Sequence, residues 1–169
     1  MEKFKPVPME QEPKRNNRFV VEFPTEFGIE SFLVQSVTRP KLTISQVEIP
    51  YMNTSYNIAG KHSWEDFTIT LIDVIGPSTT QGVMNMIMHC KTQKLNFLKE
   101  ELEGNSDFRN RILFTFSIKS LDPTGVEVEI WTVDVEELLA VDFGNCNYSD
   151  SSLQMITVKL KPHRCRLNC

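Results

Sequence analysis

The sequence lacks most of the features that mark nucleic-acid-binding and membrane proteins. Its 169 residues include 18 Lys and Arg against 22 Asp and Glu, so it has no basic excess with which to hold nucleic acid. No hydrophobic run approaches the roughly 18 residues that a membrane-spanning helix needs. The first residues also lack the apolar core of a secretory signal. We therefore expect a protein with no membrane anchor that stays in the cytoplasm in which it is made.

Signals for catalysis and for metal binding are equally sparse. Four cysteines in a reducing cytoplasm are expected to be free thiols. His163, Cys165 and Cys169 lie close together in sequence, but a structural zinc site takes four ligands. Asp142-Phe143-Gly144 spells a kinase metal-binding triplet without the glycine-rich loop and catalytic loop that belong with it. We expect no enzyme activity, no metal and no cofactor.

What the sequence does contain is alternation of apolar and polar residues, which is typical of half-buried strands. In the range 64–74, Phe67, Ile69 and Leu71 share one face. Two further alternating runs, 111–121 and 126–135, flank the turn sequence Asp122-Pro123-Thr124-Gly125 and predict a β-hairpin. Shorter strands are expected within 18–23, 31–37, 42–48 and 153–161, the last ending at Pro162.

One segment has helical character instead. Ser78, Thr79 or Thr80 can cap a helix over residues 81–98, which are rich in Met, Leu, Lys and Gln. Seven or eight strands and one helix predict a mainly β protein, an antiparallel β-sandwich or barrel with one flanking α-helix. We expect one domain over residues 18–162, between an N-terminal arm, 1–17, and a C-terminal tail, 163–169.

The segment from Tyr51 to His62 fits neither pattern. It is a run of Asn, Thr, Ser and Gly into which Tyr51, Met52, Tyr56 and Ile58 are set. A loop of this length inside a domain is usually functional or disordered, and its aromatic and apolar residues argue against disorder. We interpret it as an arm that becomes ordered against a partner, and therefore as a surface for assembly.

These residues also carry a resemblance to a known family. Ile49-Pro50, Tyr51-Met52-Asn53, Asn57-Ile58-Ala59-Gly60 and the run from Trp64 to Thr70 resemble a passage of the tail tube proteins of contractile-tailed, T-even type bacteriophages. The segments 17–23, 32–40 and 153–161 resemble the first, second and last strands of that family. The similarity covers residues 16–162.

The resemblance implies the tail-tube fold, which is shared with the tube protein of type VI secretion. It implies hexameric rings that stack into a tube inside a contractile sheath on a baseplate, located in the virion tail, with genome DNA passing through without specific binding. The inter-subunit contacts would come from the arm: Tyr51, Met52, Asn53, Tyr56, Asn57, Ile58, Ala59 and Gly60.

Acidic residues facing the channel would repel DNA phosphates and let the DNA slide. Glu127, Glu129 and Asp134 are the candidate lumen-facing acids. Three alternatives stay open: a baseplate protein that starts the tube, a type VI secretion-like tube protein and, from a different class, a monomeric β-barrel binding module.

Overall fold

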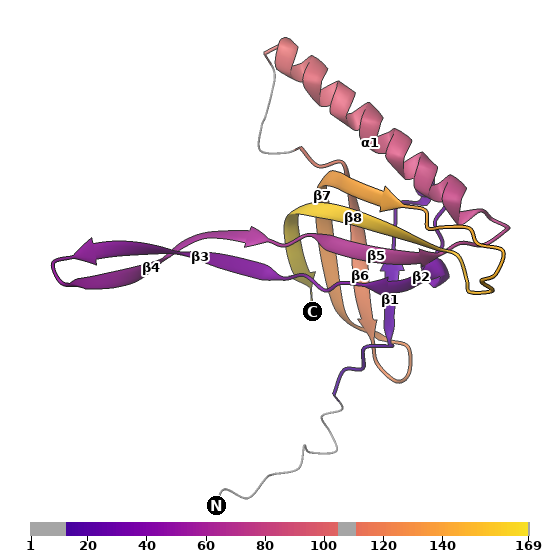
Figure 1. The fold of residues 1–169 in the computed structure, drawn as a ribbon, viewed down its shortest axis with the longest axis horizontal. Helices are drawn as coiled ribbons and strands as arrows, with labels where there is room; N and C mark the ends of the chain where they lie inside the picture. Colours follow the sequence, from indigo (N-terminus) through magenta and orange to yellow (C-terminus); the bar gives the residue numbers. More distant parts are fainter. Residues whose placement is uncertain (1–12, 105–110, 169) are drawn as a thin grey trace, which may run out of the picture.

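The computed structural model describes residues 13–104 and 111–168, and these form a β-barrel with a long helix beside it and a hairpin projecting from it (Figure 1). The elements, in chain order, are β1 (Phe19–Glu22), η1 (Thr25–Phe27), η2 (Ser31–Leu33), β2 (Val34–Val37), β3 (Leu42–Tyr51), β4 (Thr54–Trp64), β5 (Phe67–Ile72), α1 (Thr79–Leu102), β6 (Phe114–Leu121), β7 (Glu127–Asp142) and β8 (Met155–Asn168), where η marks a short 3-10 helix.

Six of the strands form one antiparallel sheet in the order β1-β6-β7-β8-β5-β2. The sheet curls into a barrel that is nearly closed, and η2 contacts β1 where the two edges approach each other. A groove of about 960 Å³ lies along this seam, with residues of β1 on one wall and residues of β2 on the other. The predicted fold class, mainly β with one flanking helix, is confirmed.

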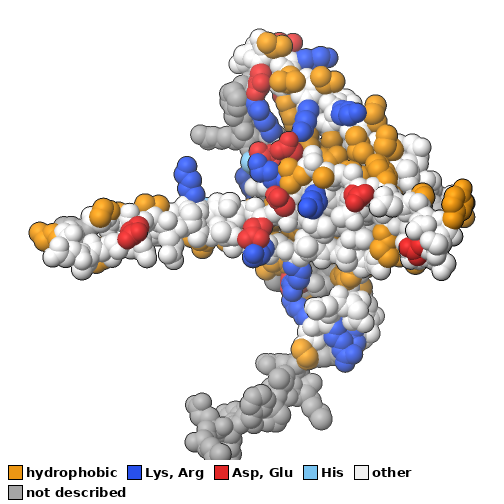
Figure 2. Space-filling model, in the orientation of Figure 1, with side chains coloured by type: hydrophobic (Ala, Val, Ile, Leu, Met, Phe, Trp, Pro, Cys, Tyr) orange, Lys and Arg blue, Asp and Glu red, His pale blue; other side chains and the backbone are white. Residues whose placement is uncertain are grey.

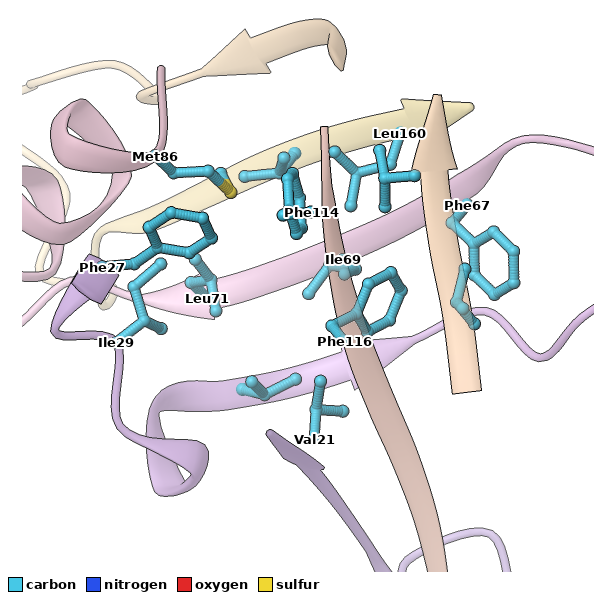
Figure 3. Close-up of a cluster of buried hydrophobic side chains, with 14 of the residues drawn as sticks. Val21, Phe27, Ile29, Phe67, Ile69, Leu71, Met86, Phe114, Phe116 and Leu160 are labelled. Carbon is cyan, nitrogen blue, oxygen red and sulfur yellow. The ribbon is translucent and has the colours of Figure 1, made fainter. Parts of the chain in front are cut away.

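The alternating residues of the sheet build the core (Figure 3). Along β5 buried residues alternate with partly exposed ones, as its sequence predicts, and Phe67, Ile69 and Leu71 are almost fully buried. Phe116 of β6 stacks against Phe23 at a ring distance of 5.7 Å and meets Phe67 edge-on at 5.9 Å. The barrel therefore buries its own apolar residues without help from another chain.

The hairpin predicted between residues 111 and 135 is also confirmed, since β6 and β7 pair with Phe116 opposite Val133. Its turn is closed by the carboxylate of Asp122, which accepts hydrogen bonds from the backbone N–H groups of Thr124 and Val126, both at 2.8 Å. Gly125 takes a φ of 86°, which is the conformation that glycine supplies most easily.

The helix is longer than the sequence suggested. It starts after Ser78, whose hydroxyl accepts a hydrogen bond from the N–H of Gln81 at 3.4 Å, and it continues to Leu102, four residues beyond the predicted end. His89 fixes it to the barrel, with Nε2 3.1 Å from the carbonyl oxygen of Leu113 and the ring edge-on to Phe27. The buried residues of the helix all lie in its first half.

Several predicted strand boundaries are also wrong. Residues 54–64 form strand β4, so the segment expected to be an unpaired loop is half of a hairpin. Strand β7 continues to Asp142, seven residues beyond the end of the predicted run 126–135. Strand β8 does not stop at Pro162 but runs on to Asn168, so most of the expected C-terminal tail belongs to the sheet.

Proline is tolerated within β8 for a specific reason. Strand β5 pairs with β8 only as far as Leu160, so beyond that point β8 is bonded on one side, and its register with β7 shifts beside Pro162. The missing N–H therefore falls where the ladder is already irregular. Of the predicted N-terminal arm, residues 1–12 lie outside the described residues, as do residues 105–110 between the predicted helix and the alternating run 111–121.

Candidate functional site: a projecting hairpin

Strands β3 and β4 form a separate two-stranded sheet that leaves the barrel and extends well away from it (Figure 1). They pair from Leu42 opposite Trp64 to Tyr51 opposite Thr54, and a two-residue turn, Met52-Asn53, joins them. An isolated two-stranded hairpin is at best marginally stable in water, because it has no second layer on which to bury side chains. We refer to residues 42–64 as the projecting hairpin.

Apolar side chains line one face of this hairpin and are largely exposed within the described residues. Val47 lies opposite Ile58 and Ile49 lies opposite Tyr56, so these four residues share a face, which we call the hairpin apolar face. Their side chains are 45–60% exposed. Between Leu42 and Trp64 the only acidic residue is Glu48 and the only lysine is Lys61. A surface with so little charge and so much exposed apolar area is typical of a protein interface.

The tip of the hairpin has an unusual backbone. Met52 has a φ of 51°, a left-handed conformation that non-glycine residues rarely adopt, and its side chain is 90% exposed. Glycine or asparagine would adopt this left-handed conformation at a lower cost in free energy. A large apolar side chain at such a position points to a contact that the single chain does not make.

A bulge sets the direction of the hairpin near its base. The register shifts between Ile44 and Gln46, where Gly60 lies against Ser45. A Cβ added at Gly60 would come within 2.6 Å of the Ser45 hydroxyl and 3.0 Å of its carbonyl oxygen. That hydroxyl donates to the carbonyl oxygen of Lys61 at 2.9 Å. Glycine is therefore needed for the two strands to approach each other at this point.

The base of the hairpin is fixed to the barrel by a compact set of contacts. Glu65 accepts hydrogen bonds from Lys41 Nζ at 2.8 Å and from Thr43 Oγ1 at 2.5 Å, and these two bonds lower the pKa of its carboxyl group. Trp64 meets Trp131 of β7 edge-on, with ring centroids 6.4 Å apart. The hairpin thus projects from an ordered base, which aims its apolar face in one direction.

The other residues predicted to make inter-subunit contacts lie on the same element. Asn53, Asn57 and Ala59 are exposed on the hairpin, and Gly60 is at its bulge. Tyr51 is the last residue of β3. The prediction covers Tyr51, the turn and β4, and it does not include Val47 and Ile49, because their partners across the hairpin cannot be read from the local sequence. That these residues contact another subunit stays a prediction.

Two of the three candidate lumen-facing acids are buried, which does not fit that role. Glu129 is only 6% exposed, because Lys14, Arg39 and the indole N–H of Trp131 converge on its carboxylate. Lys14 is the main cause of the lowered pKa of this carboxyl group, with smaller contributions from Trp131 and Arg39. A carboxylate enclosed and neutralised in this way does not present its charge to a channel.

Asp134 is likewise buried, at 2% exposure. Arg166 Nη2 binds both of its carboxylate oxygens, at 3.1 and 3.0 Å, and Thr115 donates to it at 2.8 Å. The third candidate, Glu127, is exposed and accepts a hydrogen bond from Lys119 Nζ at 2.7 Å. Of the three acids, Glu127 is the one whose predicted role is compatible with its position.

In residues 13–104 and 111–168, no three His, Cys, Asp or Glu side chains gather in a way that could hold a metal ion. Within the same residues, no helix is both long enough and apolar enough to cross a membrane. Exposed apolar side chains lie along the projecting hairpin, and Figure 2 shows that they also gather over α1.

Comparison with known proteins identifies the fold. No family model matches the sequence, and no curated protein matches it. Solved structures do match. One is that of the sheath/tube terminator of an extracellular contractile injection system, PVC, in its extended state, with a TM-score of 0.64 and 10% identity over 94% of this chain and 99% of that chain.

A second match is the tube-terminating cap of the anti-feeding prophage, AFP, with a TM-score of 0.65 and 11% identity over 97% of this chain and 95% of that chain. A third is a chain of the PVC sheath-tube complex in the extended state, with a TM-score of 0.64 and 10% identity over 98% of this chain and 99% of that chain. Identities this low establish the fold alone. The chain has the tube-like β-barrel fold found in contractile injection systems, matched over nearly its whole length.

Proposed function

We propose that this protein is a structural subunit of the tube of a contractile tail, and that it assembles through the projecting hairpin into hexameric rings. The observation that carries the proposal is an ordered hairpin with an uncovered apolar face on a fold found in contractile injection systems. The barrel buries its own core, so the exposed apolar residues of the hairpin are available for contact with another chain.

The energetics of the hairpin favour assembly. Burying an apolar side chain of the size of Val, Ile or Met contributes about 1.5–3 kcal/mol when it is fully removed from water. Val47, Ile49 and Ile58 of the hairpin apolar face and Met52 at the tip are four such exposed side chains, and Tyr56 adds an aromatic one. A ring with rotational symmetry uses two different patches on each subunit, so a projecting element that reaches the neighbouring barrel is well suited to this geometry.

A tube of this kind implies partners outside the ring. The sheath surrounds the tube and the baseplate lies at one end, so we propose both as partners, with the tube located in the virion tail after synthesis in the cytoplasm of the bacterial host. DNA would pass along the lumen without specific binding. Glu127 stays a candidate lumen-facing acid. Lys119 Nζ contacts its carboxylate at 2.7 Å and that of Glu22 at 2.8 Å, so one lysine faces both acids.

A second candidate function is a terminal ring, which either ends the tube or starts it at the baseplate. Two of the matched structures carry the words terminator or terminating cap in their descriptions, which favours this alternative to a repeating subunit. The two functions differ in a property that can be observed directly. A repeating subunit stacks into tubes of many rings, whereas a terminal ring stops after one layer.

The test is a hairpin truncation examined by negative-stain electron microscopy. Replacing residues 47–58 by Asn-Gly leaves Gln46 opposite Ala59 around a two-residue turn and keeps the bulge and the base. We expect the full chain to form rings with a central hole, stacked or single, and the truncated chain to remain a folded monomer.

The matched control is Asn57→Ser, which changes an exposed polar residue on the opposite side of β4 from Tyr56 and Ile58. This variant should assemble like the parent chain. Rings formed by the truncated chain would show that the hairpin is not the assembly element. A full chain that stays monomeric at high concentration would instead support the monomeric binding module.

A further inference from the structure

Helix α1 carries a second apolar stripe that the barrel does not use. Its members are exposed by 41–89% and lie along one side of the helix, where lysines accompany them (Figure 2). We call this set the outer helix stripe: Met84, Met88, Leu95, Leu98 and Leu102.

The inner side of the helix already accounts for its packing on the barrel. Thr79, Val83, Met86 and Cys90 are buried, and burial raises the pKa of the Cys90 thiol to about 11. These residues follow one another at helical spacing and contact the core cluster. Each member of the outer stripe is displaced around the helix from this inner row, so the outer stripe is not a continuation of the core.

The second half of the helix has little to pack against. Among its described residues 91–102, none is buried, although three exposed leucines lie there. Two ion pairs hold this half in place. Lys94 Nζ lies 3.1 Å from the carboxylate of Glu137, and Glu101 pairs with Arg111. A cleft of about 290 Å³ lies beside it, between Phe97 and Leu98 of the helix and Leu113. An amphipathic helix normally owes its stability to burial of its apolar face, and here half of the helix lacks that burial.

The spacing of the stripe indicates what could cover it. With Lys91 included, its residues follow one another at intervals of four, three, four, three and four. This is the a/d repeat of a coiled coil, in which each side chain enters a hole formed by residues of a facing helix. A flat β-hairpin does not offer holes at this period, whereas an antiparallel or parallel helix does.

The unpaired charges within the stripe and at its flanking positions are positive, whereas Glu100 lies on the opposite side of the helix. Lys91 lies within it and Lys99 lies on its flank, and neither forms an ion pair with any residue in 13–104 or 111–168. The acid that lies at a flanking position, Glu101, is already neutralised by Arg111. In a chain whose net charge is −4, this is a local reversal of sign. Complementary charge requires glutamates or aspartates on the facing helix.

We propose that the outer helix stripe is the docking site for an acidic amphipathic helix of another protein. The partner helix would place apolar residues between Met84 and Leu102 and carboxylates beside Lys91 and Lys99. A second copy of α1 fits less well, because it would bring the same lysines to the same seam. The projecting hairpin of a second copy also fits less well, because Glu48 is its only acid.

The test uses the full chain and a synthetic three-heptad peptide with Leu at the a and d positions and Glu at the e and g positions. A second peptide has Lys in place of every Glu, and binding is measured by fluorescence anisotropy. We expect the acidic peptide to bind at least about 10-fold more tightly than the basic one, since a tenfold ratio requires only a few favourable ion pairs at a partly desolvated seam.

Two variants locate the binding. Leu95→Ser with Leu102→Ser should weaken binding of the acidic peptide at least about 10-fold, and Lys91→Glu with Lys99→Glu should invert the preference between the two peptides. The control is Ile75→Ser, which removes a fully exposed apolar side chain outside the stripe. All of these positions are exposed, so far-ultraviolet circular dichroism and the unfolding midpoint should not change.

Three outcomes would overturn the proposal: binding of neither peptide, equal binding of both, or loss of self-association in the Leu95/Leu102 variant, which would make a second copy the occupant. Failure here is separable from failure of the proposed tube function. The chain with residues 47–58 replaced by Asn-Gly retains α1 and should bind the acidic peptide as the parent chain does, whether or not the hairpin drives ring formation.

Discussion

Strands β5 and β4 both carry apolar side chains on one face, but those of β5 are buried and those of β4 are exposed. In β5, Phe67, Ile69 and Leu71 are nearly fully buried in the barrel. In β4, Tyr56 and Ile58 also lie at alternate positions, yet they are 60% and 54% exposed. Alternation therefore reports that one face of a strand will be buried, but it does not report whether the cover comes from the same chain.

The comparison divides the apolar residues into two groups with different consequences. A substitution in the barrel should lower the free energy of unfolding of the single chain. A substitution on the hairpin should leave that free energy almost unchanged and act on the contacts between chains. The four predictions below test this division.

The largest effect on stability is expected from Phe116→Ala. Phe116 is 2% exposed and its ring lies 5.7–6.4 Å from those of Phe23, Phe67 and Phe114. Loss of a buried aromatic side chain leaves a cavity and should lower the free energy of unfolding by about 3–5 kcal/mol. Urea unfolding measures this change. The control is Phe32→Ala, which removes a 71% exposed ring and should cost less than about 0.5 kcal/mol. Equal losses in the two variants would contradict the assignment of the core.

A smaller and more local effect is expected from Gly60→Ala. The new methyl group would press on the hydroxyl and carbonyl oxygens of Ser45 and on Val47, which lies 3.1 Å from the added Cβ. We expect about 1–3 kcal/mol of lost protection against hydrogen exchange in the projecting hairpin.

Barrel amides should keep their protection in the Gly60→Ala variant. Adding Ser45→Ala removes the nearest clashing atom and should restore part of the protection in the hairpin, whereas Ser45→Ala alone measures the loss of its hydrogen bond to Lys61. A uniform loss across barrel and hairpin would show that the two unfold together.

The contacts of Glu129 should make stability depend on pH at the acidic end. Lys14, Trp131 and Arg39 hold the pKa of this carboxyl group below its usual value. The resulting stabilisation is present above the unfolded glutamate pKa of about 4.3 and is lost as the pH falls through the lowered folded value. Glu129→Gln should cost on the order of 1 kcal/mol at pH 7 and flatten this acid limb in urea titrations. An unchanged pH profile in the variant would rule out this linkage.

The smallest effect on stability is expected from Tyr56→Ser combined with Ile58→Ser. Both side chains are exposed, so the free energy of unfolding should change by less than about 0.5 kcal/mol. Assembly should nevertheless be lost, because the hairpin apolar face would no longer offer area to bury. Sedimentation velocity and electron microscopy measure it, with Asn57→Ser as the control. A large fall in the free energy of unfolding with assembly intact would show that these two residues stabilise the single chain and not the contacts between chains.

Local patterns were sufficient for much of the barrel. The alternation of residues 67–72 and the turn at Asp122–Gly125 each depend on neighbours within a few positions, and each is found where it is predicted. The helix cap is Ser78, one of the three candidates that the sequence offers. The second strand of the projecting hairpin was missed because its turn has methionine at the left-handed position instead of the glycine that would have signalled it.

Long-range contacts account for the other differences. The sequence placed Glu127 and Glu129 on one face and gave them one role. The structure separates them, because Lys14 and Arg39 reach Glu129 from positions 115 and 90 residues away. Pro162 was read as a strand end because nothing local shows that β8 has already lost its partner on one side.

The sequence by itself determined the mainly β class, the strand periodicity, the flanking helix and the small amount of charge in residues 42–64. These properties follow from side-chain chemistry over a few neighbouring residues. The tertiary structure alone decided that the residues after Tyr51 pair back on β3, that two acids are enclosed, and that one hairpin face and one helix stripe are exposed among the described residues. Burial is a property of how distant segments meet, so it could not be read from either segment alone.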